Sequence, residues 1–558
     1  MEKSSNFFIS SKEIANKYIQ NILFVDDEAF SSNEDSHSLN GLKITNIFAN
    51  EKKLCTLNVP KTDKDLNNTL ELAKKSDVII LDWKILLDFE ETDDNDNEED
   101  VTEDDVRGSF TLNLIAKLLE EQPNSLKLIM IYTGESALDL IVNKIHTRFV
   151  LNEIKPIENK DNELSNNNIK IIVRGKPFLA KQLNHVPHLK DWVIEYKDIP
   201  SLILDQFTEM TNGLISNVVL EAITSIRNNS SKLLSIYDKR MDVAFLSHRA
   251  MLPIMDDASE LLKESIINSI KAIFDYEEIS SKCSSEYISE WIENNIFSDS
   301  EINLSGTDIT ITNKIRKDWQ TDGFHKTFEA ILLNLKNNPS ITFEEKEQIN
   351  NKLDNFFNKK LYQFSLNYFL PKDIPNEYLE ESFSILTHHK SNHASISYIP
   401  RLSLGSVIKG CLTNKYWVCI QQKCDSVRIS PEEQRRFLFL PLEIVDKNKK
   451  FSFVAVDNSK YIYLKILSGT YDIRTIKFKS GENGVVLAKQ KEDKKYYFCP
   501  IYADLSSNDP NYKPDIDEEF LWIMDLKDAH AQRISNKFAF QLCRVGLDES
   551  EWLRKKGS

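Results

Sequence analysis

The sequence predicts a multidomain protein: an α/β domain first, an all-α region next, and a mostly antiparallel β domain with a C-terminal helix last. Three observations predict this order. The chain has 558 residues, which is too long for one hydrophobic core and suggests three domains. Its first part alternates apolar runs with helical patterns, and its middle part repeats apolar residues every three or four positions. Its last part has short β-branched and aromatic runs at regular intervals.

Residues 1–195 form the first expected domain. The run Val78–Leu81 is wholly apolar, as in a strand that is buried on both faces of a sheet. Helices are expected at 63–75, after the candidate N-cap Thr62, and at 111–121. Strands that alternate with helices predict a parallel sheet covered on both sides. The expected strands are 22–25, 42–45, 78–81, 126–132 and 169–173.

Residues 196–375 are expected to form a helical domain, because their apolar residues recur at helical spacing and proline is rare. Residues 376–558 are expected to form an antiparallel barrel or sandwich, with a terminal helix over 529–543. The expected strands of this last domain are 416–420, 436–442, 451–456, 461–467, 475–478, 485–488 and 496–498.

Composition excludes some classes of protein. No stretch of 18 apolar residues exists, so we expect no transmembrane helix, and Met1–Lys12 lacks the pattern of a signal peptide. A cytoplasmic location is the resulting expectation, and seven scattered cysteines fit a reducing compartment. The net charge of −16 argues against nucleic-acid binding by the whole surface, although a local basic patch is not excluded.

Polar residues follow the expected strands of the first domain. Asp26 and Asp27 follow the first strand, Asp82 the third, Thr133 the fourth and Lys176 the fifth. Ligands of open α/β sheets bind outside the carboxyl ends of the strands, so these groups should converge at one edge. Clustered carboxylates suit Mg²⁺, which prefers carboxylates, waters and phosphate. A carboxylate can also accept a phosphoryl group, whose oxygens a lysine and a hydroxyl would stabilise.

Five separated sequence elements together resemble the receiver domain of bacterial response regulators, which has a flavodoxin-like parallel sheet. The resemblance covers about a third of the chain. The elements are Val25-Asp26-Asp27-Glu28, Ile80-Leu81-Asp82-Trp83, Gly108, Tyr132-Thr133-Gly134 and Lys176-Pro177-Phe178.

The resemblance implies a role for each residue of the set. Asp82 would accept the phosphoryl group. Asp26 and Asp27 would hold Mg²⁺ together with Asp82 and the main-chain carbonyl of Lys84. The hydroxyl of Thr133 and the ammonium of Lys176 would contact the phosphoryl oxygens, and Gly134 would leave room beside them.

The sequence also departs from the family pattern. The residues after Glu28 have no apolar period, so the first helix of the family is short, displaced or missing. Residues 88–105 form an insertion with 12 acidic residues and no basic one, either a solvated loop or an acidic flap. A second insertion lies around 152–168, and Val173 stands where the family has an aromatic switch residue. Two hypotheses follow: a working phosphoacceptor, or a degenerate receiver kept as a docking platform.

Residues outside the first domain give weaker signals. His388, His389 and His393 are expected to form an exposed loop rather than a metal site. Cys419 and Cys424 lack the second pair that a zinc site needs. For Asp425, a bend held by its side chain and paired with Arg428 is the simpler account, and catalysis in the β domain is the alternative.

These observations lead to a functional hypothesis. The chain is expected to be a signalling adaptor rather than a catalyst, phosphorylated by a histidine-kinase-like or other ATPase partner. Its layout resembles receiver-containing proteins of prokaryotic anti-phage systems. The alternatives are a phosphorylation-independent scaffold for a partner ATPase and an effector enzyme with a site in the β domain. Oligomerisation stays open.

Overall fold

A computed structural model gives the fold, and contacts within the chain divide it into two compact units, Met1–Lys372 and Asp373–Ser558. The predicted division into three domains remains a prediction. The described residues are 5–30, 40–62, 64–85, 87, 108–122, 125–151, 158–166, 168–252, 255, 257–304, 307–336, 342, 344, 347, 365–371, 377–390, 398–430, 433–467, 469, 473–481, 484–501 and 518–542. The acidic insertion 88–105 and His393 lie outside them.

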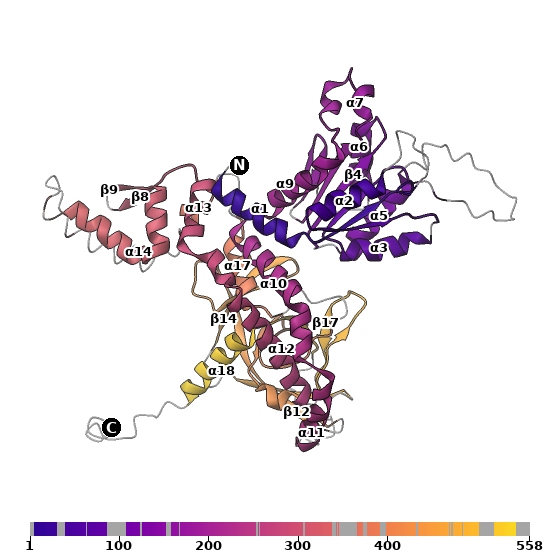
Figure 1. The fold of residues 1–558 in the computed structure, drawn as a ribbon. Helices are drawn as coiled ribbons and strands as arrows, with labels where there is room; N and C mark the ends of the chain where they lie inside the picture. Colours follow the sequence, from indigo (N-terminus) through magenta and orange to yellow (C-terminus); the bar gives the residue numbers. More distant parts are fainter. Residues whose placement is uncertain are drawn as a thin grey trace, which may run out of the picture. The chain divides into compact units, whose positions relative to one another are not determined.

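The first unit contains a mostly parallel sheet, as predicted (Figure 1). The strand order is β2-β1-β3-β4-β7-β6-β5, and the first five strands in this order run parallel. The last two form an antiparallel hairpin at the edge of β7. The strands are β1 (Asn21–Val25), β2 (Leu54–Asn58), β3 (Val78–Leu81), β4 (Lys127–Thr133), β5 (Glu158–Lys160), β6 (Glu163–Ser165) and β7 (Ile169–Gly175).

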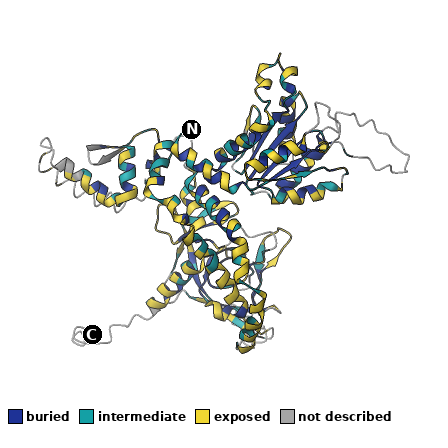
Figure 2. Cartoon of the chain, viewed as in Figure 1, coloured by how far each residue is buried: buried dark blue, intermediate teal, exposed yellow. Residues whose placement is uncertain are grey.

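Helices cover both faces of this sheet, so its central strands are buried (Figure 2). Ile79 and Leu81 point into a core with α3 (Asp65–Lys75), α5 (Ser109–Glu121) and α6 (Leu138–Leu151). Val78 and Ile80 point into a second core on the other face. That core includes residues of α1 (Asn6–Tyr18), α2 (Gly41–Asn50), α9 (Ile199–Thr211), α10 (Leu214–Ile236) and α13 (Ser285–Asn295). The second core therefore continues from the sheet into the helical region.

The structure corrects one expected strand. Residues 42–45 lie in α2, and the second strand is β2, which the sequence did not reveal. The run Leu42-Lys43-Ile44-Thr45 alternates by chance within an amphipathic helix that starts at the N-cap Asn40. The first helix of the family was expected to be short, displaced or missing. The helix between the first two strands is displaced to 41–50.

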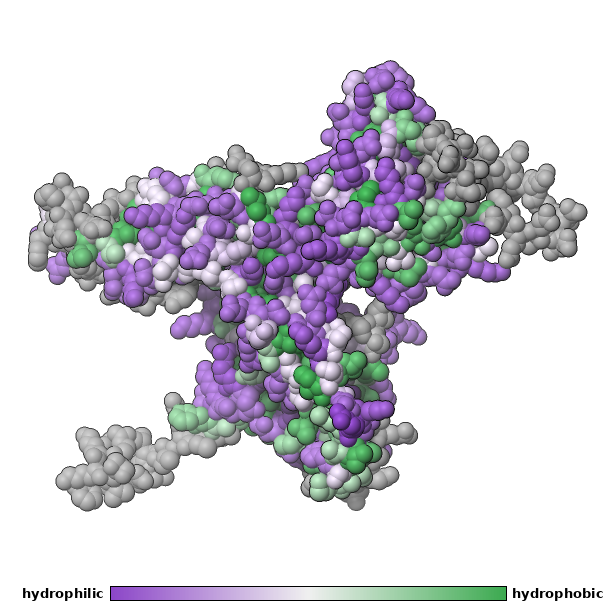
Figure 3. All heavy atoms as spheres, viewed as in Figure 1, coloured by the Kyte–Doolittle hydropathy of each residue, from purple (hydrophilic) through white to green (hydrophobic). Residues whose placement is uncertain are grey.

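The rest of the first unit is mainly helical, as predicted, but includes the hairpin of β8 (Ser300–Leu304) and β9 (Thr307–Ile311). Hydrophobic residues, green in Figure 3, lie on the surface over α11 (Asp242–Met251), where Val243 and Leu246 are exposed. The remaining elements are α7 (Leu179–Gln182), α8 (Pro187–Lys190), η1 (Tyr196–Asp198), η2 (Lys239–Met241), α11 (Asp242–Met251), α12 (Asp257–Tyr276), η3 (Ile279–Cys283), α14 (Asn313–Lys336) and η5 (Ser365–Tyr368).

The second unit is an antiparallel sheet with a final helix, as predicted, although β10, β16 and β18 were not predicted. The expected strand 485–488 is wrong, because only Leu487 makes an isolated bridge there, with Arg401. No helix in the described part of the chain has the length and apolar character needed to cross a membrane. The elements are α17 (Leu379–His388), β10 (Ser406–Gly410), β11 (Tyr416–Cys419), η6 (Lys423–Ser426), β12 (Gln434–Val445), β13 (Phe453–Asp457), β14 (Lys460–Ile466), β15 (Arg474–Lys479), β16 (Lys489–Gln490), β17 (Tyr496–Phe498), β18 (Phe520–Asp525) and α18 (Asp528–Leu542).

The expected exposed histidine loop is wrong for the two histidines that the structure describes. His388 and His389 are buried, and the Nε2 atom of each lies within 3.1 Å of the carbonyl oxygen of Val454. Burial lowers the pKa of both, to about 4 for His389. These side chains therefore pack as neutral groups at the end of α17.

Candidate functional site

The carboxyl edge of the parallel sheet gathers the predicted site residues. Asp26 directly follows β1, and Asp82 directly follows β3. Thr133 is the last residue of β4, and Lys176 directly follows β7. Asp26, Asp82, Thr133 and Lys176 are buried, and Asp27 is half-buried. The parallel register of these four strands is what brings together residues 150 positions apart in sequence.

Three carboxylates lie close together at this edge. Each of Asp26, Asp27 and Asp82 offers an oxygen within 4.8 Å of the others, and among the described residues this is the one such group of three. Hard oxygen ligands at this spacing fit a divalent cation of the Mg²⁺ type. Lys84, two residues after Asp82, is half-buried, and its carbonyl remains a predicted ligand.

Lys176 bridges two of these carboxylates. Its Nζ lies 2.9 Å from Oδ2 of Asp26 and 2.8 Å from Oδ2 of Asp82. Burial disfavours the Lys176 cation, but the charges of Asp82 and Asp26 outweigh this effect and raise the pKa of Lys176. The lysine is therefore held charged between two acids, and it offsets part of their mutual repulsion.

Backbone groups hold the other oxygens of the same two acids. The N–H of Trp83 donates to Oδ1 of Asp82 at 2.7 Å, and the N–H of Glu28 donates to Oδ1 of Asp26 at 2.9 Å. The buried hydroxyl of Thr111, on α5, donates to the main-chain oxygen of Asp82 at 2.8 Å. Thr111 was not predicted as a site residue, because a threonine in the first turn of a helix has no distinctive sequence signal.

The environment changes the acidity of Asp82. Burial raises its pKa, Lys176 and the hydroxyl of Thr133 lower it, and the charge of Asp26 raises it further, with a result of about 6. An acid with this pKa is largely ionised at neutral pH, but it exchanges its proton within reach of physiological conditions. A bound cation would favour the ionised form.

Two glycines near the site are required by close packing. A Cβ on Gly134 would lie 2.8 Å from the ring of Phe178, so this glycine makes room for Phe178. The backbone of Gly108 has φ +86°, and a Cβ there would lie 2.3 Å from the ring of Trp83. Both sequence elements therefore have a packing reason that is independent of any ligand.

An aromatic pair that the sequence did not reveal lies beside the site. Tyr132 precedes Thr133, and its ring packs edge-on against Tyr196 with centroids 5.8 Å apart. Burial raises the pKa of Tyr196, and the charges of Lys176, Asp26 and Asp82 also act on it, which places it close to the acids. Val173 is buried within β7. Tyr196 comes from η1, outside the five elements on which the resemblance rests.

The comparison with protein families identifies this part of the chain. A family model described as the response receiver domain matches residues 18–180. These residues form a receiver domain. The match spans β1 to β7 and includes all five predicted side chains of the site. No curated protein and no solved structure matches the chain.

The receiver domain assigns a general role. It supports a function as a signalling regulator, since receiver domains generally bind Mg²⁺ and interact with kinases or other partners. The cluster of Asp26, Asp27 and Asp82 has the chemistry that such a cation needs.

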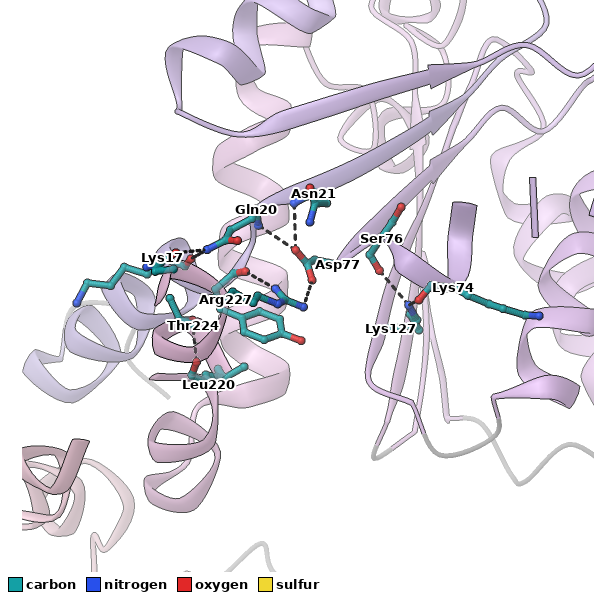
Figure 4. A network of polar contacts seen from close by, with 12 residues as sticks. Lys17, Gln20, Asn21, Lys74, Ser76, Asp77, Lys127, Leu220, Thr224 and Arg227 are labelled. Atoms are coloured by element: carbon teal, nitrogen blue, oxygen red, sulfur yellow. Dashed lines mark hydrogen bonds and ion pairs between the residues drawn. The ribbon is translucent and has the colours of Figure 1, made fainter. Parts of the chain in front are cut away.

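The opposite end of the receiver sheet holds another buried acid (Figure 4). Asp77 precedes β3, and its Oδ2 accepts the N–H groups of Gln20 and Asn21 at 2.9 and 3.0 Å. Nη2 of Arg227, on α10, donates to Oδ1 of Asp77 at 2.9 Å. The Arg227 guanidinium also lies over the ring of Tyr18, 4.6 Å from its centroid. This network ties the receiver sheet to the helix α10.

Proposed function

We propose that the receiver domain accepts a phosphoryl group on Asp82 from a partner kinase, and that the protein acts as a signalling adaptor. The observation that carries this proposal is the cluster of three carboxylates with Lys176 across two of them. A buried cluster of this kind is costly to fold unless a cation or an equivalent partner compensates it.

Asp26, Asp27 and Asp82 would hold Mg²⁺ together with the carbonyl of Lys84. The cation would neutralise charge on the incoming phosphoryl group. An oxygen of Asp82 attacks the phosphorus, a bond from phosphorus to the donor atom breaks, and the donor leaves with the electron pair. Lys176 and the hydroxyl of Thr133 would then face the phosphoryl oxygens.

The phosphodonor partner would be a histidine-kinase-like or other ATPase in the cytoplasm. A setting within an anti-phage system is part of the same proposal, and it rests on the likeness of the domain layout. A kinase-like ATPase encoded beside this protein would support that setting.

Intact-mass spectrometry tests the proposal directly. The full-length protein is incubated with acetyl phosphate and MgCl₂, and we expect a phosphoryl adduct that EDTA suppresses. Asp82→Asn should lose the adduct. Asp77→Asn is the matched control, because Asp77 is also buried and lies at the other end of the same strand. An adduct that persists in Asp82→Asn, or none in the wild type, would reject the proposal.

The scaffold hypothesis makes the opposite prediction. Its supporting observation is that buried Val173 takes the position of the aromatic switch residue. A scaffold would bind its partner ATPase equally well as wild type and as Asp82→Asn, with or without acetyl phosphate.

A further inference from the structure

The charge of this protein is unevenly distributed along the chain. Residues 398–501 contain 19 lysines and arginines against 10 aspartates and glutamates, an excess of nine positive charges. The whole chain has a net charge of −16, so the remaining residues carry an excess of 25 negative charges. Over its whole length, 376–558, the β domain has 28 lysines and arginines against 24 aspartates and glutamates, so its positive charge is concentrated in residues 398–501. A basic surface attracts polyanions.

A groove in the β domain combines aromatic, amide and ammonium groups. It has a volume of about 570 Å³ and is open to solvent. Its lining residues include parts of β18, of the β13–β14 turn and of the β16–β17 turn. The residues that carry the argument are Tyr398, Asn458, Lys494, Lys495, Tyr496 and Trp522.

Three aromatic rings that line the groove contact one another, with Trp522 between the other two. Tyr496 on β17 and Trp522 on β18 lie edge to face with ring centroids 6.3 Å apart. The ring centroid of Tyr398 lies 6.1 Å from that of Trp522. The hydroxyl of Tyr398 donates to Oδ2 of Asp525 at 3.0 Å, which fixes this ring. All three side chains are half-buried, so part of each ring is open to a ligand.

Two adjacent lysines line the groove beside these rings. Nζ of Lys495 donates to the amide oxygen of Asn458 at 2.8 Å, which links the two turns without neutralising the charge. Lys494 is exposed, and its main-chain oxygen accepts the side-chain amide of Gln490 at 3.2 Å. The acid in the groove, Asp457, is already paired, since Nζ of Lys409 lies 2.7 Å from its Oδ2. The lining therefore has two lysines against one carboxylate that is already paired, while Asp493 of the same turn accepts the hydroxyl of Tyr497 at 2.6 Å.

We propose that this groove binds single-stranded nucleic acid. Exposed bases would stack on the rings of Tyr398, Trp522 and Tyr496, and phosphates would lie against Lys494 and Lys495. Half-exposed aromatic rings beside lysines are the combination that single strands require, because every base has a face that can stack. A duplex hides its bases, and an acidic peptide offers no row of planar groups to occupy the rings.

Fluorescence anisotropy with full-length protein tests the proposal. The probes are labelled oligouridylate and oligothymidylate of about 16 nucleotides. We expect binding to at least one probe, and a roughly tenfold or greater loss of affinity in K494E/K495E and in Tyr496→Leu. In K494E/K495E, the slope of log affinity against log salt concentration should also become less steep by about 1.4, the value for two lost phosphate contacts.

The matched control is K449E/K450E. It reverses two adjacent exposed lysines in the connection between β12 and β13, two strands of the same sheet that both pair with β14. We expect it to retain most of the affinity, and circular dichroism verifies that every variant folds. Equal losses in K494E/K495E and K449E/K450E would overturn the proposal, because they would show general charge attraction. It is also overturned if neither probe binds, if duplex DNA binds as tightly, or if a free mononucleotide displaces the oligonucleotide with the same affinity.

Discussion

Two buried aspartates flank the four-residue strand β3, and they differ in how their charge is compensated. Asp77, before the strand, has its two oxygens occupied by two backbone N–H groups and by the Arg227 guanidinium. Asp82, after the strand, shares one lysine with Asp26 and has further carboxylates beside it. Asp77 is compensated by its own fold, whereas the cluster around Asp82 has more negative charge than Lys176 can offset.

This difference fits a structural role for Asp77 and the reactive role that we propose for Asp82. Removing the charge of Asp77 would leave its donors without a partner in a buried site. Removing the charge of Asp82 would relieve repulsion, since Lys176 would keep Asp26 as its partner. The following predictions test this contrast, from the largest expected effect to the smallest.

The largest effect is expected for stability. Asp77→Asn should lower the free energy of unfolding by about 3 kcal/mol, because it breaks a buried ion pair. Asp82→Asn should change it by less than about 1 kcal/mol, or should stabilise the protein, because it removes like-charge repulsion. Urea unfolding of both variants in EDTA, followed by far-UV circular dichroism, measures the two values. Equal losses would show that Asp82 also has a mainly structural role.

A smaller effect is expected from the cation. Mg²⁺ at 100 times its dissociation constant should raise the free energy of unfolding by about 2.7 kcal/mol in the wild type. Asp82→Asn and Asp26→Asn should lose most of this gain, since each removes one of the three clustered carboxylates. Thermal unfolding with and without MgCl₂ provides the measurement, and Asp77→Asn should keep its Mg²⁺-dependent shift. A shift of the same size in all variants would contradict a specific site.

The smallest effect is expected from pH. The pKa of Asp82 is raised to about 6 in the fold, above its value in the unfolded chain. The folded state therefore binds more protons between these two values, and this contribution to stability disappears as the pH rises through 6. Without a cation, the wild type should lose about 1 kcal/mol relative to Asp82→Asn between pH 5 and pH 7. The free energy of unfolding of both proteins is measured against pH in EDTA. A difference between them that does not change with pH would show that the fold does not shift the pKa of Asp82.

Much of the receiver fold was predictable because β3 is wholly apolar and because β1, β4 and β7 contain apolar runs. An apolar run such as Val78–Leu81 predicts a strand that is buried on both faces of a parallel sheet. The polar residues that follow such runs then lie at the carboxyl edge of the sheet. Residues 42–45 were misassigned because a four-residue window cannot distinguish alternation from one face of a helix. The half-exposed strand β2 has a mixed pattern and was missed.

The site was predictable where its residues directly follow or end strands. Asp26, Asp82, Thr133 and Lys176 each occupy such a position. Thr111 and Tyr196 escaped notice because their roles depend on tertiary packing, which no local pattern encodes. The histidines of α17 show the same limit, since a polar-looking cluster is buried against the carbonyl of Val454.

The hairpin of β5 and β6 has a consequence for the behaviour of the protein at high concentration. Without this hairpin, β7 would be the edge strand of the sheet, with one row of unpaired backbone N–H and C=O groups along its seven residues. Such a border recruits strands from other molecules and starts aggregation. The hairpin moves the border to β5, which has only three residues, Glu158–Lys160, two of them charged. A short charged strand is a poor template for further pairing, so the insertion acts as a built-in safeguard of solubility for this sheet.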